Sequence, residues 1–193
     1  MGAGLEWACE RTLEGHVKTV FALASLGDKL ISGSLDGTIR VWDLSTGRLD
    51  ATLTGHKMSV YALVVEGGRL YSASLDGTIR VWDVGTWAEA RSVAAYDVAK
   101  ARRYSRCLLT SGSKLISGSY LSYSSEDNTE LLRITRSVYG GDTECEVRVW
   151  DLDTLACEHT VRLAAGPDVR CLAGAGGAVW GGVGESVAVW GRD

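Results

Sequence analysis

Short apolar runs recur along the chain and alternate with polar, glycine-containing turns. Val20–Ala24 and Val60–Val65 are two such runs, and both are too short for typical helices. Each is followed, after a glycine, by a second extended segment, Lys29–Ser34 or Arg69–Ser74. This pattern predicts short β-strands joined by tight turns.

Asp-Gly pairs mark the next turn in each unit. Asp36-Gly37 and Asp76-Gly77 each lie between two extended segments, which is a strong signal for a β-hairpin. The segments that follow, Thr38–Asp43 and Thr78–Asp83, alternate and are rich in β-branched residues. A fourth segment, Leu49–Leu53, precedes the next unit. Each unit is therefore expected to form four short antiparallel strands, here called a to d.

The units repeat in the sequence itself. The decapeptide SLDGTIRVWD occurs unchanged at Ser34–Asp43 and Ser74–Asp83, forty residues apart. Tryptophans mark the same interval, with gaps of 40, 68 and 40 residues between Trp42, Trp82, Trp150 and Trp190. The long gap equals one unit plus 28 residues, five before Ser119 and 23 after it. A fixed period of this length indicates a repeat architecture.

The motif GH…SGSLDGTIRVWD at this spacing resembles the WD-repeat family of β-propellers. The resemblance implies an all-β propeller domain, residues 1–193, with about four blades of four antiparallel strands. The expected parts are a closing strand d at 7–13, blade 1 at 16–53, blade 2 at 56–93, blade 3 at 94–163 with an insertion at 120–145, and strands a to c of blade 4 at 164–193.

The ends of the chain suggest how the ring closes. Residues 7–13 align with a strand d, whereas the last unit stops after its strand c. We therefore expect the N-terminal strand to complete the last blade, which would also hide an exposed sheet edge. Two other arrangements remain open: two chains sharing one ring, and a chain that is a fragment of a seven-bladed propeller.

Serine, histidine and aspartate recur together in the first two units. These are the residue types of a hydrolase triad, but an enzyme needs one such site and here the set occurs twice. The family resemblance implies a structural tetrad instead, in which tryptophan donates to serine, serine to histidine and histidine to aspartate. The residues assigned to such tetrads are His16, Ser34, Asp36, Trp42, His56, Ser74, Asp76, Trp82, Ser119, Trp150 and Trp190.

Composition narrows the classes of partner. The net charge of −4 argues against nucleic acid as a ligand. Five cysteines, none at CxxC spacing, predict no metal site and no disulfide framework, so a cytoplasmic or nuclear location is expected. The apolar stretch Cys171–Trp190 fits the last repeat better than a membrane span. No catalytic residue and no cofactor are predicted.

The expected function is that of a non-catalytic scaffold that binds other proteins. Both insertions of unit three fall on the propeller face that carries the d–a connections and b–c turns, and the first is basic enough to attract an acidic or phosphorylated segment. The partner-binding residues carried over or expected there are Phe21, Leu35, Tyr61, Leu75, Arg102, Arg103, Arg106 and Arg170. The alternatives are the substrate-recognition subunit of a ubiquitin ligase, a propeller-fold hydrolase and, as a partner, a second copy in a homodimer.

Overall fold

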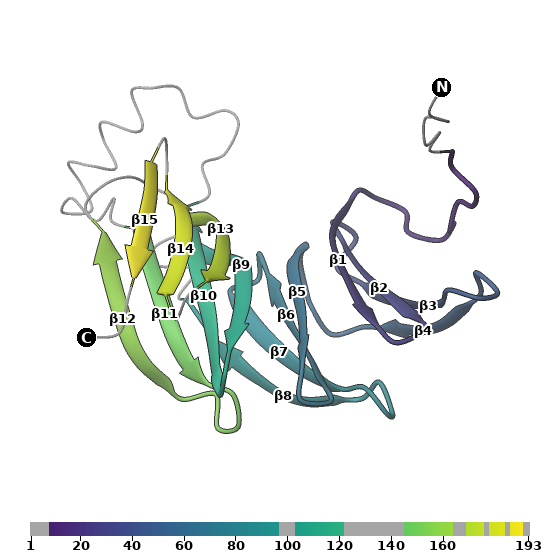
Figure 1. Cartoon of the computed structure of the whole chain (residues 1–193). Coiled ribbons are helices and arrows are strands. Elements are labelled where there is room, and N and C mark those ends of the chain that lie inside the picture. The colour runs from purple at the N-terminus through teal and green to yellow at the C-terminus, as the bar shows by residue number, and fades with distance from the viewer. Residues whose placement is uncertain are drawn as a thin grey trace, which may run out of the picture.

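The chain folds into four antiparallel sheets, which are the blades expected from the repeat (Figure 1). The computed structural model describes residues 8–96, 103–121, 145–163, 169–175, 178–183 and 186–190. Blade 1 consists of β1 (Val20–Leu26), β2 (Lys29–Ser34), β3 (Ile39–Asp43) and β4 (Leu49–Leu53). Blade 2 consists of β5 (Val60–Glu66), β6 (Arg69–Ser74), β7 (Thr78–Asp83) and β8 (Glu89–Ala94).

The other two blades come from the C-terminal half of the chain. Blade 3 consists of β9 (Arg103–Ser111), β10 (Lys114–Leu121), β11 (Cys145–Asp151) and β12 (Cys157–Leu163). Blade 4 has three strands, β13 (Val169–Ala175), β14 (Ala178–Val183) and β15 (Ser186–Trp190). The prediction of an all-β fold built from antiparallel blades is confirmed.

Glycine allows the turn between the first two strands of a blade to be tight. Gly67 and Gly68 have φ values of 56° and 72°, and the strand residues that flank them, Glu66 and Arg69, pair directly. Positive φ at both central residues matches the twist of the flanking strands in a two-residue hairpin.

Each innermost strand begins with a β-bulge. In β1, Val20 pairs with Ser34 and Ala22 with Gly33, so the residue between them has no partner of its own. The same shift occurs at the start of β5, β9 and β13. A bulge of this kind disrupts the ladder locally and re-aims the extra side chain.

Neighbouring blades pack through apolar side chains of their facing sheets. Ile31, Ile39 and Val41 of blade 1 form one buried cluster with Val60 and Leu70 of blade 2. At the centre of this contact, a Cβ on the glycine at position 33 would lie 2.7 Å from Val60 Cγ1. The glycine therefore makes room for the valine of the next blade. Blades 3 and 4 repeat the arrangement, with Gly118 beneath Val169.

The blades follow one another in an arc, with blade 1 and blade 4 on opposite sides of blade 2 (Figure 1). Within the described residues the predicted closing strand is wrong, because residues 8–13 form no strand and the described part of blade 4 has three strands. Instead, the Arg11 guanidinium donates to the carbonyls of Leu44 and Ser45 in the β3–β4 turn of blade 1, both at 3.4 Å. Trp7, the first residue of the expected strand, lies outside the described residues.

In the described parts of the chain, no helix is long and apolar enough to cross a membrane.

Candidate interaction surface

Blade 2 contains a chain of side-chain hydrogen bonds that links its strands. Trp82 Nε1 donates to Ser72 Oγ at 2.9 Å, and Ser72 Oγ lies 2.7 Å from His56 Nε2. His56 Nδ1 lies 3.0 Å from Asp76 Oδ2. Since the indole can only donate, the serine proton goes to Nε2, and the Nδ1 proton of a neutral imidazole goes to the carboxylate. Every member of the chain thereby has a partner.

Blade 1 repeats this chain with almost the same geometry. Trp42 Nε1 and His16 Nε2 each lie 2.8 Å from Ser32 Oγ, and His16 Nδ1 lies 2.9 Å from Asp36 Oδ2. The imidazole also packs edge-on against the indole at a centroid distance of 6.3 Å. The histidine, aspartate and tryptophan of the expected tetrads are therefore brought together in both blades.

The serine of the tetrad was assigned to the wrong position. The structure uses Ser32, Ser72 and, in blade 3, Ser117, where the sequence analysis placed Ser34, Ser74 and Ser119. Ser32 pairs directly with Arg40, so Trp42 is one diagonal step away. Ser34 pairs near Thr38, about 13 Å along the strand from Trp42, which is beyond the reach of the indole.

The serines at the expected positions support turns instead. Ser34 Oγ accepts the N–H of Asp36 at 3.1 Å and donates to the carbonyl of Lys18 at 3.2 Å. Ser74 makes the equivalent bonds in blade 2, and Ser119 Oγ accepts the backbone N–H of Glu146 at 2.7 Å. These bonds hold each b–c connection against the start of a neighbouring strand.

Asp36 and Asp76 remain ionised although they are largely buried. Burial acts to raise the pKa of Asp36, but hydrogen bonds from the Thr38 side chain and N–H, from His16 and from the Val17 N–H outweigh it. The pKa of this carboxyl is therefore held well below its usual range, and that of Asp76 is lowered in the same way. Each carboxylate joins the b–c turn to the loop that enters strand a.

Blade 3 lacks the histidine, and Tyr96 stands in its region. Trp150 Nε1 still donates to Ser117 Oγ at 2.9 Å. The Tyr96 ring lies beside Ser117, is 5% exposed, and has the Arg148 guanidinium 4.4 Å from its centroid. Burial raises the pKa of this phenol. The side chain of Trp190, the expected tetrad member of blade 4, lies outside the described residues, and so do Gly166 and Pro167.

The burial of these serines disfavours a hydrolase. The side chains of Ser32 and Ser72 are 3% and 0% exposed, and both hydroxyls are bonded to an indole N–H and a histidine. A nucleophile must reach a substrate carbonyl, and these oxygens lie inside the blades. Among the described residues, no group of three or more metal-binding side chains gathers either.

Four of the expected partner-binding residues occupy one recurring position. Phe21, Tyr61, Arg106 and Arg170 are the extra residues of the four bulges that begin β1, β5, β9 and β13. Because β1, β5, β9 and β13 pack against one another in succession, these four side chains start from neighbouring strands. The family resemblance predicted these four positions as partner-binding, and that role stays a prediction; the structure shows that each of them has no ladder partner of its own.

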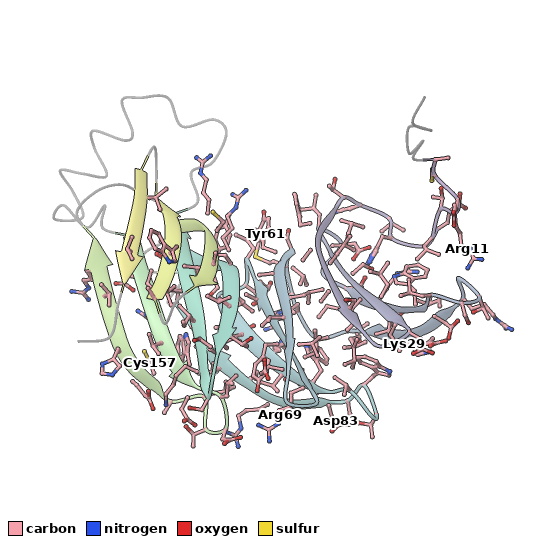
Figure 2. The ribbon with its side chains drawn as sticks, in the orientation of Figure 1. Arg11, Lys29, Tyr61, Arg69, Asp83 and Cys157 are labelled. Carbon is pink, nitrogen blue, oxygen red and sulfur yellow. The ribbon has the colours of Figure 1, made fainter. Side chains whose placement is uncertain are left out.

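Three of these side chains form a continuous aromatic and cationic row, the turn-face row. The rings of Phe21 and Tyr61 are 4.9 Å apart, and Tyr61 stacks on Tyr104 at 5.1 Å. The Arg106 guanidinium lies 5.7 Å from the Tyr61 ring centroid, within the range of a cation–π contact. Phe21 remains 46% exposed, whereas Tyr104 is buried beneath the row. Figure 2 shows Tyr61 at the end of β5 opposite to Arg69 and Asp83.

The b–c turns flank this row. The N–H of Leu35 donates to the carbonyl of Thr19 at 2.8 Å, and Leu75 makes the same bond to Ser59 in blade 2. Leu35 is 37% exposed, and Met58 in the next d–a loop is 46% exposed. Sequence reasoning missed Met58 and Tyr104. The available signal was their position, since Met58 lies three residues before Tyr61 and Tyr104 lies two residues before Arg106.

The basic insertion is only partly described. Arg102 lies outside the described residues, and so does the side chain of Arg103, whose backbone pairs with Leu121 at the start of β9. Most of the expected insertion at 120–145 also lies outside them, at positions 122–144. The cations described on this face are Lys18, Lys57, Arg106 and Arg170.

Comparison with known families identifies the repeat. The family model described as "WD domain, G-beta repeat" matches residues 7–43 and 47–83. The chain is 57% identical over 37 residues, 19% of its length, to the WD repeat-containing protein pop1 of Schizosaccharomyces pombe. It is 62% identical over 37 residues to mitochondrial division protein 1 of Sclerotinia sclerotiorum, again over 19% of the chain. These matches span 5% and 6% of the relatives' own lengths.

Solved structures share the fold over nearly the whole chain. The designed Ika4 protein is 27% identical with a TM-score of 0.70, and the match covers 94% of this chain and 96% of Ika4. The designed Ika8 protein gives the same identity and TM-score, but the match covers 48% of Ika8. A chain in the Mitotic Checkpoint Complex, 18% identical, has a TM-score of 0.69 over 95% of this chain and 52% of that chain.

Proposed function

We propose that this chain, which carries WD repeats at residues 7–43 and 47–83, is a non-catalytic platform that binds a protein partner through the face that carries the turn-face row. WD-repeat proteins generally act as scaffolds for protein interactions and are generally non-catalytic. Because a fold does not fix a function, the proposal rests on the site itself. The observation that carries it is the turn-face row.

The turn-face row has the chemistry of an interaction hot spot. Aromatic and arginine side chains supply most of the energy at protein interfaces, particularly where they cluster. Phe21 is 46% exposed, as is Met58 nearby, so the row offers apolar area as well as charge. The side chains of Asp36 and Asp76 are each hydrogen-bonded to a histidine.

The charge of this face indicates the chemistry of the partner. Four cations stand on it, Lys18, Lys57, Arg106 and Arg170, in a chain whose net charge is −4. These cations favour a partner segment with carboxylates or phosphates. We therefore expect an acidic or phosphorylated peptide whose apolar side chains contact Phe21 and Tyr61.

A displayed peptide library selected on the purified chain tests the proposal. Peptides recovered by the wild-type chain should be enriched in aspartate, glutamate or phosphoserine beside an aromatic or aliphatic residue. Phe21→Ala and Arg106→Ala should each weaken the binding of synthetic copies at least about tenfold, since truncated hot-spot residues cost more than about 1.4 kcal/mol. Leu49→Ala, which is 43% exposed on β4 at the outer edge of blade 1, is the matched control and should bind normally.

Two results would refute the proposal. One is a selection that recovers no peptides, and the other is a set of peptides that bind Phe21→Ala and wild type equally. Circular dichroism of each variant separates loss of contact from loss of fold.

A further inference from the structure

The C-terminal end of the arc exposes a face whose equivalent is buried or partly buried in the other three blades. On blade 4, Trp180, Val187 and Val189 are 40%, 70% and 50% exposed. Trp180 is equivalent to Ile31 of blade 1. Each residue lies on the second strand of its blade, and Trp180 pairs with Ala173 and Val189 where Ile31 pairs with Ala24 and Val41. The corresponding residues of blade 1 are Ile31, Ile39 and Val41, and each is 0% exposed. Among the residues that the structure describes, nothing packs on this face of blade 4.

The N-terminal end of the arc exposes the complementary face. Val20 is 43% exposed, whereas Val60 and Val169 at the same register position are 0% exposed. Leu23 is 63% exposed, whereas its equivalent Leu63 packs against the cluster between blades 1 and 2. The exposed face of blade 1 is therefore equivalent to the face that blades 2 and 4 pack against the blade before them.

Residue size is matched across each boundary between blades. At the centre of the contact, Val60 lies over Gly33 and Val169 lies over Gly118, both too close to admit a Cβ. Between blades 2 and 3 both residues of this contact differ. Ala73 replaces the glycine, and Ser105 replaces the valine. A larger residue on one side thus accompanies a smaller residue on the other.

The two open ends carry the valine–glycine combination. Val20 is at the valine position of blade 1, and Gly182, which pairs with Cys171 as Gly33 pairs with Ala22, is at the glycine position of blade 4. Among the described residues, a Cβ on Gly182 would meet only Cys171 Sγ of its own blade. The room that Gly33 gives to Val60 is therefore present at Gly182 with no valine above it.

We propose that a second copy of the chain docks head to tail on the first, with the β1 face of one copy against the β14–β15 face of the other. The two faces lie at opposite ends of the arc in Figure 1, so one copy does not join them. Two copies would form two identical contacts and close a ring, the usual outcome when a head-to-tail interface closes. The designed Ika8 chain fits this size, since the match to it fills 48% of its length.

The same docking gives the N-terminal segment a place. Blade 4 ends at β15, whose outer edge has no strand beside it among the described residues. An unpaired edge of this kind invites another strand. The segment at 8–13, which precedes β1, would reach that edge from the second copy, with Leu13 at the position that Leu53 holds opposite Ile39 in blade 1. The strand expected to close the chain on itself would then close it on its partner.

Solution mass measured by light scattering and sedimentation tests the proposal. The wild-type chain should reach twice its 20.6 kDa over roughly 1–100 µM. Val20→Asp and Val187→Asp should each lower the association constant at least about tenfold, because each would bury an unpaired carboxylate in an apolar contact. Both positions are exposed in a single copy, so the blades themselves should stay folded.

Mixing the two variants separates this docking from any other association. In an equimolar mixture, the intact β1 face of the Val187→Asp chain can meet the intact blade 4 face of the Val20→Asp chain, so a mixed dimer should form where neither variant dimerises alone. The matched control Leu35→Asp, at an exposed turn that is on neither end face, should keep the wild-type mass. It should lose the peptide binding described above, so the two proposals can fail separately.

The proposal is overturned if the wild-type chain stays monomeric throughout that range. It is also overturned if its mass keeps rising with concentration, if both aspartate variants keep the wild-type mass, or if the mixture gives no mixed dimer.

Discussion

Ser72→Ala is the sharpest test of the hydrogen-bond chain, because it removes one oxygen that satisfies two buried groups. Ser72 is 0% exposed and holds Trp82 Nε1 at 2.9 Å and His56 Nε2 at 2.7 Å. The alanine variant leaves the indole N–H and the imidazole nitrogen without partners in the interior of blade 2. Each orphaned group costs about 1–3 kcal/mol, so the free energy of unfolding should fall by about 2–6 kcal/mol.

Urea unfolding followed by far-UV circular dichroism measures this loss without depending on tryptophan fluorescence. All variants are compared at one protein concentration, since association would contribute to stability. Ser92→Ala is the matched control: this serine is exposed on β8 of the same blade, and its loss should change the free energy by less than about 0.5 kcal/mol.

A double-mutant cycle with Trp82→Phe assigns the loss to the Ser72–Trp82 bond. Trp82→Phe removes the indole N–H, so adding Ser72→Ala should then cost about 1 kcal/mol less than it does in the wild type. Additive effects within about 0.3–0.5 kcal/mol, or a Ser72→Ala loss below about 0.5 kcal/mol, would refute the reasoning.

Three further outcomes follow from the geometry. Because Asp36 and Asp76 have lower pKa values folded than unfolded, their stabilisation is full above about pH 4 and is lost as pH falls further; the urea midpoint should drop there, and less so in Asp76→Asn. Gly33→Ala should destabilise by about 1–3 kcal/mol in the same assay, since its Cβ would lie 2.7 Å from Val60 Cγ1. Burial raises the pKa of the Cys107 thiol to about 12, so mass spectrometry should find it unalkylated by iodoacetamide in the native protein.

Each of these outcomes has its own control. Gly174→Ala should be mild, because its Cβ would meet Leu109 at an ordinary 3.5 Å. Cys157 and Cys171 are exposed and should be alkylated while Cys107 is spared. A midpoint that is flat between about pH 5 and 2.5 would contradict the role given to the two carboxylates.

The strands and their order could be predicted from the sequence because the signals are local. Asp36-Gly37 and its copy forty residues later fix two hairpins, and the alternating segments beside them fix two strands each. The choice between Ser32 and Ser34 could not be made from pattern alone, since residues two apart share a face of the strand. The choice depends on the pairing register of the two strands, which can be obtained by counting residue pairs away from the Asp-Gly turn.

The closing strand failed for a different reason. The sequence shows that residues 7–13 resemble a strand d and that the last unit stops after its strand c, but similarity does not say where in the fold the segment packs. Tyr96 lies forty residues after His56, but it was missed because the five extra residues before Ser119 shift the expected histidine position away from it when the spacing is counted back from that serine. In both cases the deciding contact is long-range, where local pattern carries no information.

The extra residue at the head of each innermost strand has an evolutionary consequence. Phe21 and Tyr61 make no ladder pair, so exchanging them leaves the pairs on either side, Val20 with Ser34 and Ala22 with Gly33, untouched. Under the proposed function, mutations at such sites can alter what the molecule binds without changing the pairing of the strands. Selection can therefore change binding preference without changing the strand pairing that defines the fold.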